Sequence, residues 1–160
     1  MHQLGATFHT YGKLLKGNRT FQKSVVAYKN ALAVLDADNY ALELTATHNN
    51  RGAVLHHLGE SEENPERLKE AINSYEKALT VSMEQQRPFH LAVIIRVNKA
   101  TAQNVLAELT NNAVLAEEVA DEFEVIIECF QHALQPLCLK HGQEQMKKAK
   151  SLSLPMSASG

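Results

Sequence analysis

The feature that most constrains this 160-residue chain is an apolar helical face that occurs three times. The clearest copy spans Asn64 to Met83, where apolar residues keep the three-and-four spacing of one side of an α-helix and charged residues fill the other side. Asn64 is a suitable N-cap, and Pro65 fits the first helical position, where an amide hydrogen has no helical partner. The segment is therefore predicted to be an amphipathic helix with one buried side.

The same face appears 47 residues earlier and 55 residues later in this alignment. Each copy ends in an aromatic residue, two variable positions and Ala-Leu. The three endings are Tyr28-Lys29-Asn30-Ala31-Leu32, Tyr75-Glu76-Lys77-Ala78-Leu79 and Phe130-Gln131-His132-Ala133-Leu134. Internal repeats of this kind are typical of architectures in which each unit buries its apolar face against its neighbours. The recurrence predicts a stacked array of helices.

The three repeated helices alternate with other periodic segments, which supply their partners. Helices are expected at about His2 to Lys16, Thr20 to Leu35, Tyr40 to Leu58, Pro88 to Leu109, and from the Asn111-Asn112 turn to about Pro136. Gly59 is placed after the C-cap of the helix that begins at Tyr40. The helices form three pairs, with repeats at about 5–38, 40–86 and 88–140 inside a repeat domain at 1–142. Residues 143–160 are short, basic and serine-rich, and are expected to form a flexible tail.

The helix pairs predict an all-α fold in which neighbouring pairs stack, because no single pair can bury both of its faces alone. Such a stack curves and leaves a concave groove lined mainly by the first helix of each pair. Met1 directly precedes the first periodic segment, with no capping residue before it. This position indicates that the chain begins inside, or at the edge of, a longer array.

Composition argues against several functional classes. Sixteen basic and eighteen acidic residues give a net charge of -2, so no global field favours nucleic acid or an anionic membrane. No apolar run approaches the roughly 20 residues of a membrane span, and the N-terminus lacks the basic and apolar segments of a signal peptide. Two cysteines make no disulfide framework. The sequence therefore predicts a soluble cytoplasmic protein without a cofactor.

The second helices, with their aromatic-x-x-Ala-Leu endings, resemble the B helices of the tetratricopeptide repeat, whose pattern also places a small residue in the middle of its first helix. The matching positions are Phe8, Gly12, Ser24, Tyr28 and Ala31 in the first repeat, and Gly52, Ala71, Tyr75 and Ala78 in the second. The third repeat departs from the pattern, because bulky Ile126 stands where the others have Ser24 and Ala71. The resemblance covers roughly residues 5–136 and implies a right-handed α-α superhelix of three helix pairs, six helices in all.

The long helices and the run Asn49-Asn50-Arg51-Gly52 resemble the extended arrays found beside caspase-like peptidase domains and in kinesin light chain relatives. In that wider family the repeats are protein-binding scaffolds rather than enzymes. The resemblance therefore implies a non-catalytic module that binds a protein or peptide. Family members that hold a C-terminal carboxylate use a basic and asparagine set, of which the corresponding positions here retain only Asn50, so that mode is not expected.

The partner is expected to lie across the concave groove, on first-helix positions that packing does not require. Asn50 and Asn98 occupy corresponding sites there, and an asparagine amide can donate to and accept from a peptide backbone at once. Bonding of these asparagines to the neighbouring helix is an equally weighted alternative. The predicted groove consists of His9, Lys13, Asn49, Asn50, Ala53, His57, Asn98 and Thr101.

Cys129-x-x-His132 and Cys138-x-x-His141 suggest a different function, a metal-binding enzyme with four zinc-type ligands. The two cysteines are nine positions apart, about two and a half helical turns, which points them to opposite sides of a continuous helix. Only a break at Pro136 would bring them together. No metal-protease spacing of histidines, phosphate loop or nucleophile elbow occurs in the chain. The sequence therefore predicts neither a metal site nor catalytic residues.

A purely structural role is the remaining alternative. A short array with an exposed terminal helix can self-associate by burying Leu4, Phe8 or the last helix against a second copy. The chain would then be a spacer or dimerisation segment of a larger protein.

Overall fold

The computed structural model describes residues 18–34, 40–84, 89–132 and 134–154. The described part contains six α-helices and no β-strand. They are α2 (Asn18–Leu32), α3 (Ala41–Ser61), α4 (Pro65–Glu84), α5 (Phe89–Thr110), α6 (Ala113–Phe130) and α7 (Pro136–Ser153). The predicted all-α class is thus confirmed, and α2 to α6 correspond to five of the six predicted helices. The helix expected from about His2 to Lys16 lies outside the described residues, together with the predicted groove residues His9 and Lys13.

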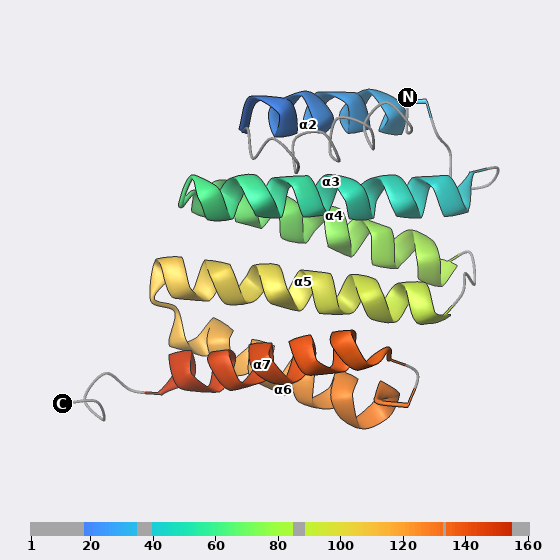
Figure 1. Cartoon of the computed structure of the whole chain (residues 1–160). Helices are drawn as coiled ribbons and strands as arrows, with labels where there is room; N and C mark the ends of the chain where they lie inside the picture. The colour runs from blue at the N-terminus through green and yellow to red at the C-terminus, as the bar shows by residue number, and fades with distance from the viewer. Residues whose placement is uncertain (1–17, 35–39, 85–88, 133, 155–160) are drawn as a thin grey trace.

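Consecutive helices run in opposite directions and pack against one another (Figure 1). In addition, α3 contacts α5, and α5 contacts α7. We call these three helices the odd layer, and α2, α4 and α6 the even layer. Within the described residues, no two helices of the even layer come within 8 Å of each other at their Cα atoms. The backbones of the odd layer therefore approach one another along the stack, whereas those of the even layer lie further apart.

The α3–α4 and α5–α6 pairs share one turn design at an interval of 48 residues. Glu63 and Asn111 follow α3 and α5 with positive φ angles of 51° and 50°. The next amide in each turn, that of Asn64 or Asn112, donates to the carbonyl five residues back, at 2.8 and 2.9 Å. This Schellman arrangement stops a helix by satisfying its last carbonyls. Each asparagine side chain also caps the following helix by accepting a backbone N–H at 3.0 Å.

The buried faces of α4 and α6 follow the same 48-residue interval. Tyr75 and Phe123 occupy equivalent positions and are 1% and 0% exposed. Phe130, which the sequence aligned with Tyr75, is only partly buried, so the predicted register of the third copy is wrong. The two alignments differ by seven residues, close to two helical turns, and apolar periodicity therefore fits both. In the corrected register Val119 corresponds to Ala71, and both are buried.

The core consists of apolar clusters between successive helices. One cluster joins α3, α4 and α5 and contains Leu55, Ala71, Tyr75, Ala78, Ile95 and Ala102. Another joins α5, α6 and α7 and contains Val93, Val97, Ala100, Val119, Ala120, Phe123, Ile126 and Ala149. Tyr28 links α2 to α3. Burial raises the pKa of Tyr28 to about 12 and also raises that of Tyr75, because both phenols lie in apolar surroundings.

Two glycines in α3 allow α4 to approach closely. A Cβ atom on Gly52 would lie 2.7 Å from the Tyr75 ring, and one on Gly59 would lie 2.7 Å from Leu68. The sequence places Gly59 after the C-cap, but the structure buries it inside α3. Its role is therefore close packing, while Glu63 provides the positive φ angle that ends the helix.

The C-terminal segment forms a helix where the sequence predicts a flexible tail from residue 143. The continuous helix expected to reach about Pro136 instead ends at Phe130, and α7 begins at Pro136 and continues to Ser153. This helix packs on α6 and contacts α5. Its buried residues are Gly142 and Ala149. Because small residues form this buried side, the apolar signal is weak in the sequence, and the helical domain extends beyond the predicted boundary at 142.

Candidate functional site

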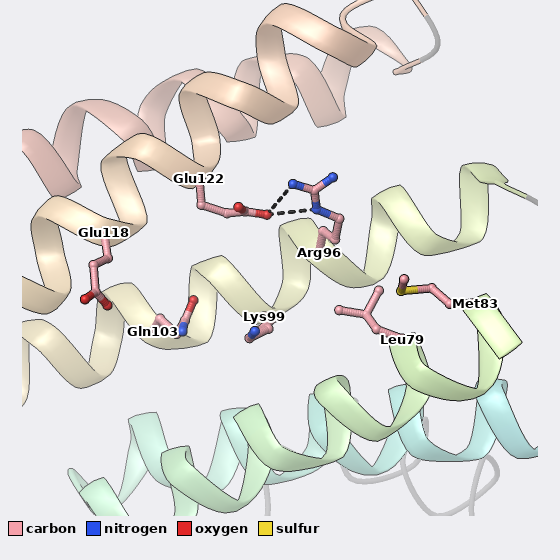
Figure 2. Close-up of a pocket in the computed structure, with 7 residues that line it drawn as sticks. All are labelled: Leu79, Met83, Arg96, Lys99, Gln103, Glu118 and Glu122. Carbon is pink, nitrogen blue, oxygen red and sulfur yellow. Dashed lines mark hydrogen bonds and ion pairs between the residues drawn. The ribbon is translucent and has the colours of Figure 1, made fainter.

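A groove opens between α4 and α6, with α5 as its floor. Its volume is about 520 Å³, and its lining residues are Leu79, Met83, Arg96, Lys99, Gln103, Glu118 and Glu122. Figure 2 shows that the first two come from α4, the next three from α5 and the two glutamates from α6. We call this opening the α4–α6 groove. Its volume falls within the range of pockets that hold a small ligand or a few side chains of a partner.

The floor of the groove is one face of α5. Arg96, Lys99 and Gln103 follow a spacing of three and four, which places them on the same side of the helix, and all three are half-buried. Adjacent faces of α5 are occupied by the core. Ile95 packs in the cluster with α3 and α4, and Ala100 packs in the cluster with α6 and α7. The core therefore fixes the orientation of the polar face.

Arg96 is held at the α6 side of the groove. Its Nε and Nη2 atoms both lie 2.8 Å from the Oε1 atom of Glu122, as Figure 2 shows. Its guanidinium carbon lies 5.8 Å from the centre of the Phe130 ring, within cation–π range. The Arg96 and Glu122 side chains are 31% and 36% exposed, so the pair contributes at most about 1 kcal/mol to stability. Its main effect is to orient two groups of the groove.

The other cation of the groove is also paired. The Lys99 Nζ atom lies 3.4 Å from the Oε1 atom of Glu76 in α4. Glu118, in contrast, has no ion-pair partner among the described residues. In Figure 2 the carboxylate of Glu118 and the amide of Gln103 reach into the space between α6 and α5. These two groups are placed to bond a molecule that enters the groove.

Helix α6 gives its side of the groove a negative potential. It carries six acidic residues and no basic residue. The acidic residues are Glu117, Glu118, Asp121, Glu122, Glu124 and Glu128. Within the described part of the chain, only Glu122 has a cation at ion-pair distance. Exposed charges act over about one Debye length, roughly 8 Å at physiological salt, so this wall attracts cations near the groove.

The opposite wall, from α4, is apolar. Met83 is 74% exposed, and Leu79 is half-buried beside it. A methionine side chain is flexible and polarizable and adapts to apolar groups of different shape. The α4–α6 groove thus combines an apolar wall, a polar floor and an acidic wall.

The residues predicted to bind a peptide lie on α3 and α5 in the odd layer, and some bond to neighbouring helices. The Asn98 Nδ2 atom donates to the Asn49 Oδ1 atom at 3.1 Å, which joins α5 to α3. The Thr101 hydroxyl oxygen lies 2.9 Å from the Nε2 atom of His141 in α7. For Asn98, the contact present is therefore the interhelical bond that stood as an alternative to peptide binding.

The other described members of the predicted groove differ in exposure. Asn50 and Ala53 are half-buried, and His57 is exposed. The six described members are thus shared between two adjacent helices. Their side chains are not among those that line the α4–α6 groove.

Besides the contact between Thr101 and His141, further polar contacts join α5 to α7. Buried Asn104 donates through Nδ2 to the backbone oxygen of Gln145 at 2.9 Å and to its Oε1 atom at 3.0 Å. The Lys148 Nζ atom lies 2.7 Å from the Oε2 atom of Glu108. We call these contacts, with the one made by His141, the α5–α7 polar seam. The seam occupies polar groups of α5 that would otherwise be available to a partner.

The Cys–His pairs do not converge on one point. Cys129 and His132 are exposed at the end of α6, whereas Cys138 and His141 are half-buried in α7. The helix does break before Pro136, yet His141 is turned toward α5. Nowhere in the described part of the chain do three His, Cys, Asp or Glu side chains come close enough to hold a metal ion.

Two histidines of α3 are kept neutral near pH 7 by their surroundings. Burial lowers the pKa of His48 to about 4, and the positive charges of Lys77 and Arg51 act in the same direction. The Nδ1 atom of His48 is buried and has no hydrogen-bond partner among the residues that the structure describes. Burial also lowers the pKa of His56, although Glu60, 3.3 Å from its Nε2 atom, opposes this shift. Neither histidine lines the α4–α6 groove.

The sequence pattern does not predict the α4–α6 groove, because it places binding on the first helices alone. One signal was available: α6 has six acidic residues and no base, although it is a repeat of the mixed-charge helix α4. A second signal was the change from an apolar residue, Leu55, to a polar one, Gln103, at equivalent positions of α3 and α5.

Comparison with known proteins gives no family for this chain. No protein-family model matches it, and neither curated proteins nor solved structures give a match. Among the described helices, none combines the length and the apolar character that crossing a bilayer requires.

Proposed function

We propose that this protein is a non-catalytic interaction scaffold of the tetratricopeptide-like class, and that a partner protein or peptide docks in the α4–α6 groove. The observation that carries the proposal is the groove itself. It opens between two helices that both pack on α5, and its walls present exposed Met83 and the uncompensated carboxylate of Glu118. A site with an apolar wall and a few directed polar groups is typical of a recognition surface.

The helix pairs support the assignment to this repeat class. Gly52 of α3 packs under Tyr75 of α4, and the equivalent positions in the next pair are Ala100 and Phe123, all of them buried. A small residue in the first helix below an aromatic residue of the second is the pattern that the resemblance to tetratricopeptide repeats implies. The proposed architecture is a right-handed stack of such pairs, with α7 in the place of a further first helix.

The α4–α6 groove is favoured over the odd layer because polar groups of the odd layer already bond to neighbouring helices. Asn98 is bonded to Asn49, and the α5–α7 polar seam occupies Thr101, Asn104 and Glu108. A partner on that side would have to replace existing bonds, which costs about as much as the new bonds return. In the groove, contacts with Glu118 and Gln103 would replace water, since neither side chain makes an ion pair or a hydrogen bond with another of the described residues.

The proposal is tested by capturing partners from the native host with the wild-type protein and two matched double variants. Leu79→Ala with Gln103→Ala alters the α4–α6 groove, and Asn50→Ala with Asn98→Ala alters the odd layer. We expect the groove variant to bind a recovered partner about tenfold or more weakly, the usual effect of removing interface anchors. The odd-layer variant should retain most of the affinity.

Circular dichroism and thermal denaturation first confirm that both variants are folded. The proposal is contradicted if the wild type enriches no protein over an unrelated helical control. It is equally contradicted if the odd-layer variant loses the partner while the groove variant keeps it.

A dimerising spacer is the second candidate function, favoured by exposed apolar residues on the last described helix. Leu137 and Leu154, near the two ends of α7, are 82% and 64% exposed. Burial of such residues against a second copy would stabilise a dimer. Sedimentation over a range of concentrations, with Leu137→Gln as the comparison, separates a dimer that needs α7 from a monomeric scaffold.

A further inference from the structure

From the charge and shape of the α4–α6 groove, we infer that its occupant is a basic amphipathic segment of a partner protein, which places a cationic side chain against Glu118 and an apolar side chain against Met83. The inference rests on the proposed scaffold function and adds the chemistry of the partner. It is carried by charge complementarity, by the apolar wall and by the size of the groove.

The uncompensated charge of the groove is negative. Both cations of the lining already have acidic partners: Arg96 pairs with Glu122 at 2.8 Å, and Lys99 pairs with Glu76 at 3.4 Å. Glu118 is left without an ion pair among the described residues. An arginine or lysine entering beside it would gain a charge-assisted hydrogen bond, and the Gln103 carbonyl oxygen could accept a second N–H. An acidic partner would meet an unopposed carboxylate instead.

The outer face of α6 extends this negative potential beyond the groove. Glu117, Asp121, Glu124 and Glu128 follow a spacing of four, three and four along α6, and all four are exposed. Such a row lies on the same helix as the acidic wall of the groove and would steer a cationic segment toward it. The same row disfavours nucleic acid and anionic lipid as occupants, because both carry negative charge.

Because one wall of the groove is apolar, the partner needs apolar side chains as well as positive charge. Met83 and Leu79 present an apolar surface from α4 on the side opposite Glu118 and Glu122. The groove volume of about 520 Å³ accepts a few side chains and not a whole helix. A segment with apolar residues on one face and basic residues on the next would fill both halves, as amphipathic helices do in other grooves.

Three fluorescent synthetic peptides test the inference on the full chain by fluorescence anisotropy. They share leucine and methionine at helical spacing, and their polar positions are lysine and arginine, glutamine and serine, or glutamate. We expect the basic peptide to bind at least about tenfold more tightly than the neutral one and the acidic peptide not to bind. Raising the salt concentration should weaken binding of the basic peptide, but measurable binding should remain because of contacts with the apolar wall.

Two pairs of substitutions distinguish binding of the peptide in the groove from non-specific attraction to the protein surface. Glu118→Lys and Glu124→Lys change the net charge equally on the same helix, but only Glu118 lines the groove. Met83→Ala and Leu137→Ala both remove an exposed apolar side chain, and only Met83 lines the groove. We expect the groove substitution of each pair to weaken binding of the basic peptide by about tenfold. The control substitution should weaken this binding by less than about threefold.

Equal weakening by Glu118→Lys and Glu124→Lys would overturn the inference, since attraction would then be non-specific. Tighter binding of the acidic or the neutral peptide would also overturn it. If no peptide binds while groove variants still lose a captured partner, the partner is not a basic amphipathic segment and the scaffold function stands. If captured partners survive every groove substitution as well, the proposed function itself is wrong.

Discussion

Two faces of the molecule occupy the same place in successive repeats but are used differently. The face on α3 consists of His48, Arg51 and Leu55, and the equivalent face on α5, 48 residues later, consists of Arg96, Lys99 and Gln103. On α3, Leu55 is fully buried, Arg51 donates to the Ser74 hydroxyl, and burial keeps His48 neutral. On α5 the three side chains are half-buried and line the α4–α6 groove.

The difference lies in the side chains, because the two helices end in the same turn and carry partner helices in the same register. A leucine at position 55 joins the core, whereas a glutamine at position 103 can bury its amide only if it finds a hydrogen-bond partner. The glutamine therefore stays at the edge of an opening. In this chain the repeated residues build the stack, and the departures from the repeat create the groove.

The largest effect on stability is expected from exchanging Leu55 and Gln103, the equivalent residues at which the two faces differ most. Leu55→Gln places an amide at a fully buried site and should lower the free energy of unfolding by about 4 kcal/mol, from lost apolar burial and an unpaired amide. The reciprocal Gln103→Leu should change it by less than about 1 kcal/mol, since that residue lines an opening. Urea denaturation followed by circular dichroism measures both. Similar losses in the two variants would remove the distinction between the faces.

Two glycines, Gly52 in α3 and Gly142 in α7, offer the next comparison. Gly52→Val drives a branched side chain into the Tyr75 ring, 2.7 Å from the position of its Cβ atom, and should cost about 2 to 3 kcal/mol. Gly142→Ala in α7 meets nothing closer than Ile127 at 3.8 Å and should stabilise the protein by up to about 1 kcal/mol through helix propensity. Thermal denaturation of both variants checks the sign of each change. A stabilising Gly52→Val would mean that α3 and α4 do not approach closely.

A pH-dependent effect is expected from the titration of His48. Its pKa is lowered to about 4 in the folded protein, against about 6.5 when unfolded, so the folded state binds fewer protons between these values. Stability should therefore fall as the pH drops from 6.5 toward 4. His48→Leu should remove roughly 1 to 3 kcal/mol of this fall and leave the pH 7 to 8 difference from wild type constant.

Urea denaturation at pH 8, 7, 5.5 and 4.5 measures this pH dependence in both proteins. An equal loss of stability in both proteins between pH 7 and 4.5 would show that His48 is not buried as a neutral group. The equivalent residue of α5, Arg96, is paired with Glu122 instead.

Much of the stack could be predicted from the sequence because its signals are local. Helix α4 was expected from Asn64 to Met83 and is found at Pro65–Glu84, with the side chain of Asn64 accepting from the Glu66 amide. The buried aromatic residues of α2 and α4 were also identified. These predictions rest on apolar spacing, helix caps and small residues, which act within a few turns of the helix.

Helix α7 could not be recognised in the same way, because its fixing contacts are polar. His141, Gln145 and Lys148 contact α5 at 2.7 to 3.0 Å, but in a sequence they resemble an exposed face. Its buried residues, Gly142 and Ala149, add little apolar signal. The register of α6 failed for a related reason, since a shift of seven residues leaves the apolar face almost unchanged.

The candidate site was the least predictable part. The sequence located polar positions on the first helices, but it could not tell that Asn98 bonds Asn49 or that a helix lies beside Thr101. The α4–α6 groove arises from residues on three helices, up to 43 positions apart from Leu79 to Glu122. Such a site depends on how far apart the helices lie in the stack, and periodicity carries no information about that distance.

Hydrogen–deuterium exchange of the protein with a recovered partner tests the central claim. This claim is that the α5 face binds the partner, whereas the equivalent α3 face only stabilises the fold. We predict added protection in peptides covering residues 76–83 of α4 and 118–122 of α6, and at 96–103 of α5. Peptides covering residues 48–57 of α3 should exchange at the same rate with and without the partner. Protection confined to 48–57, with none at 76–83 or 118–122, would contradict the account.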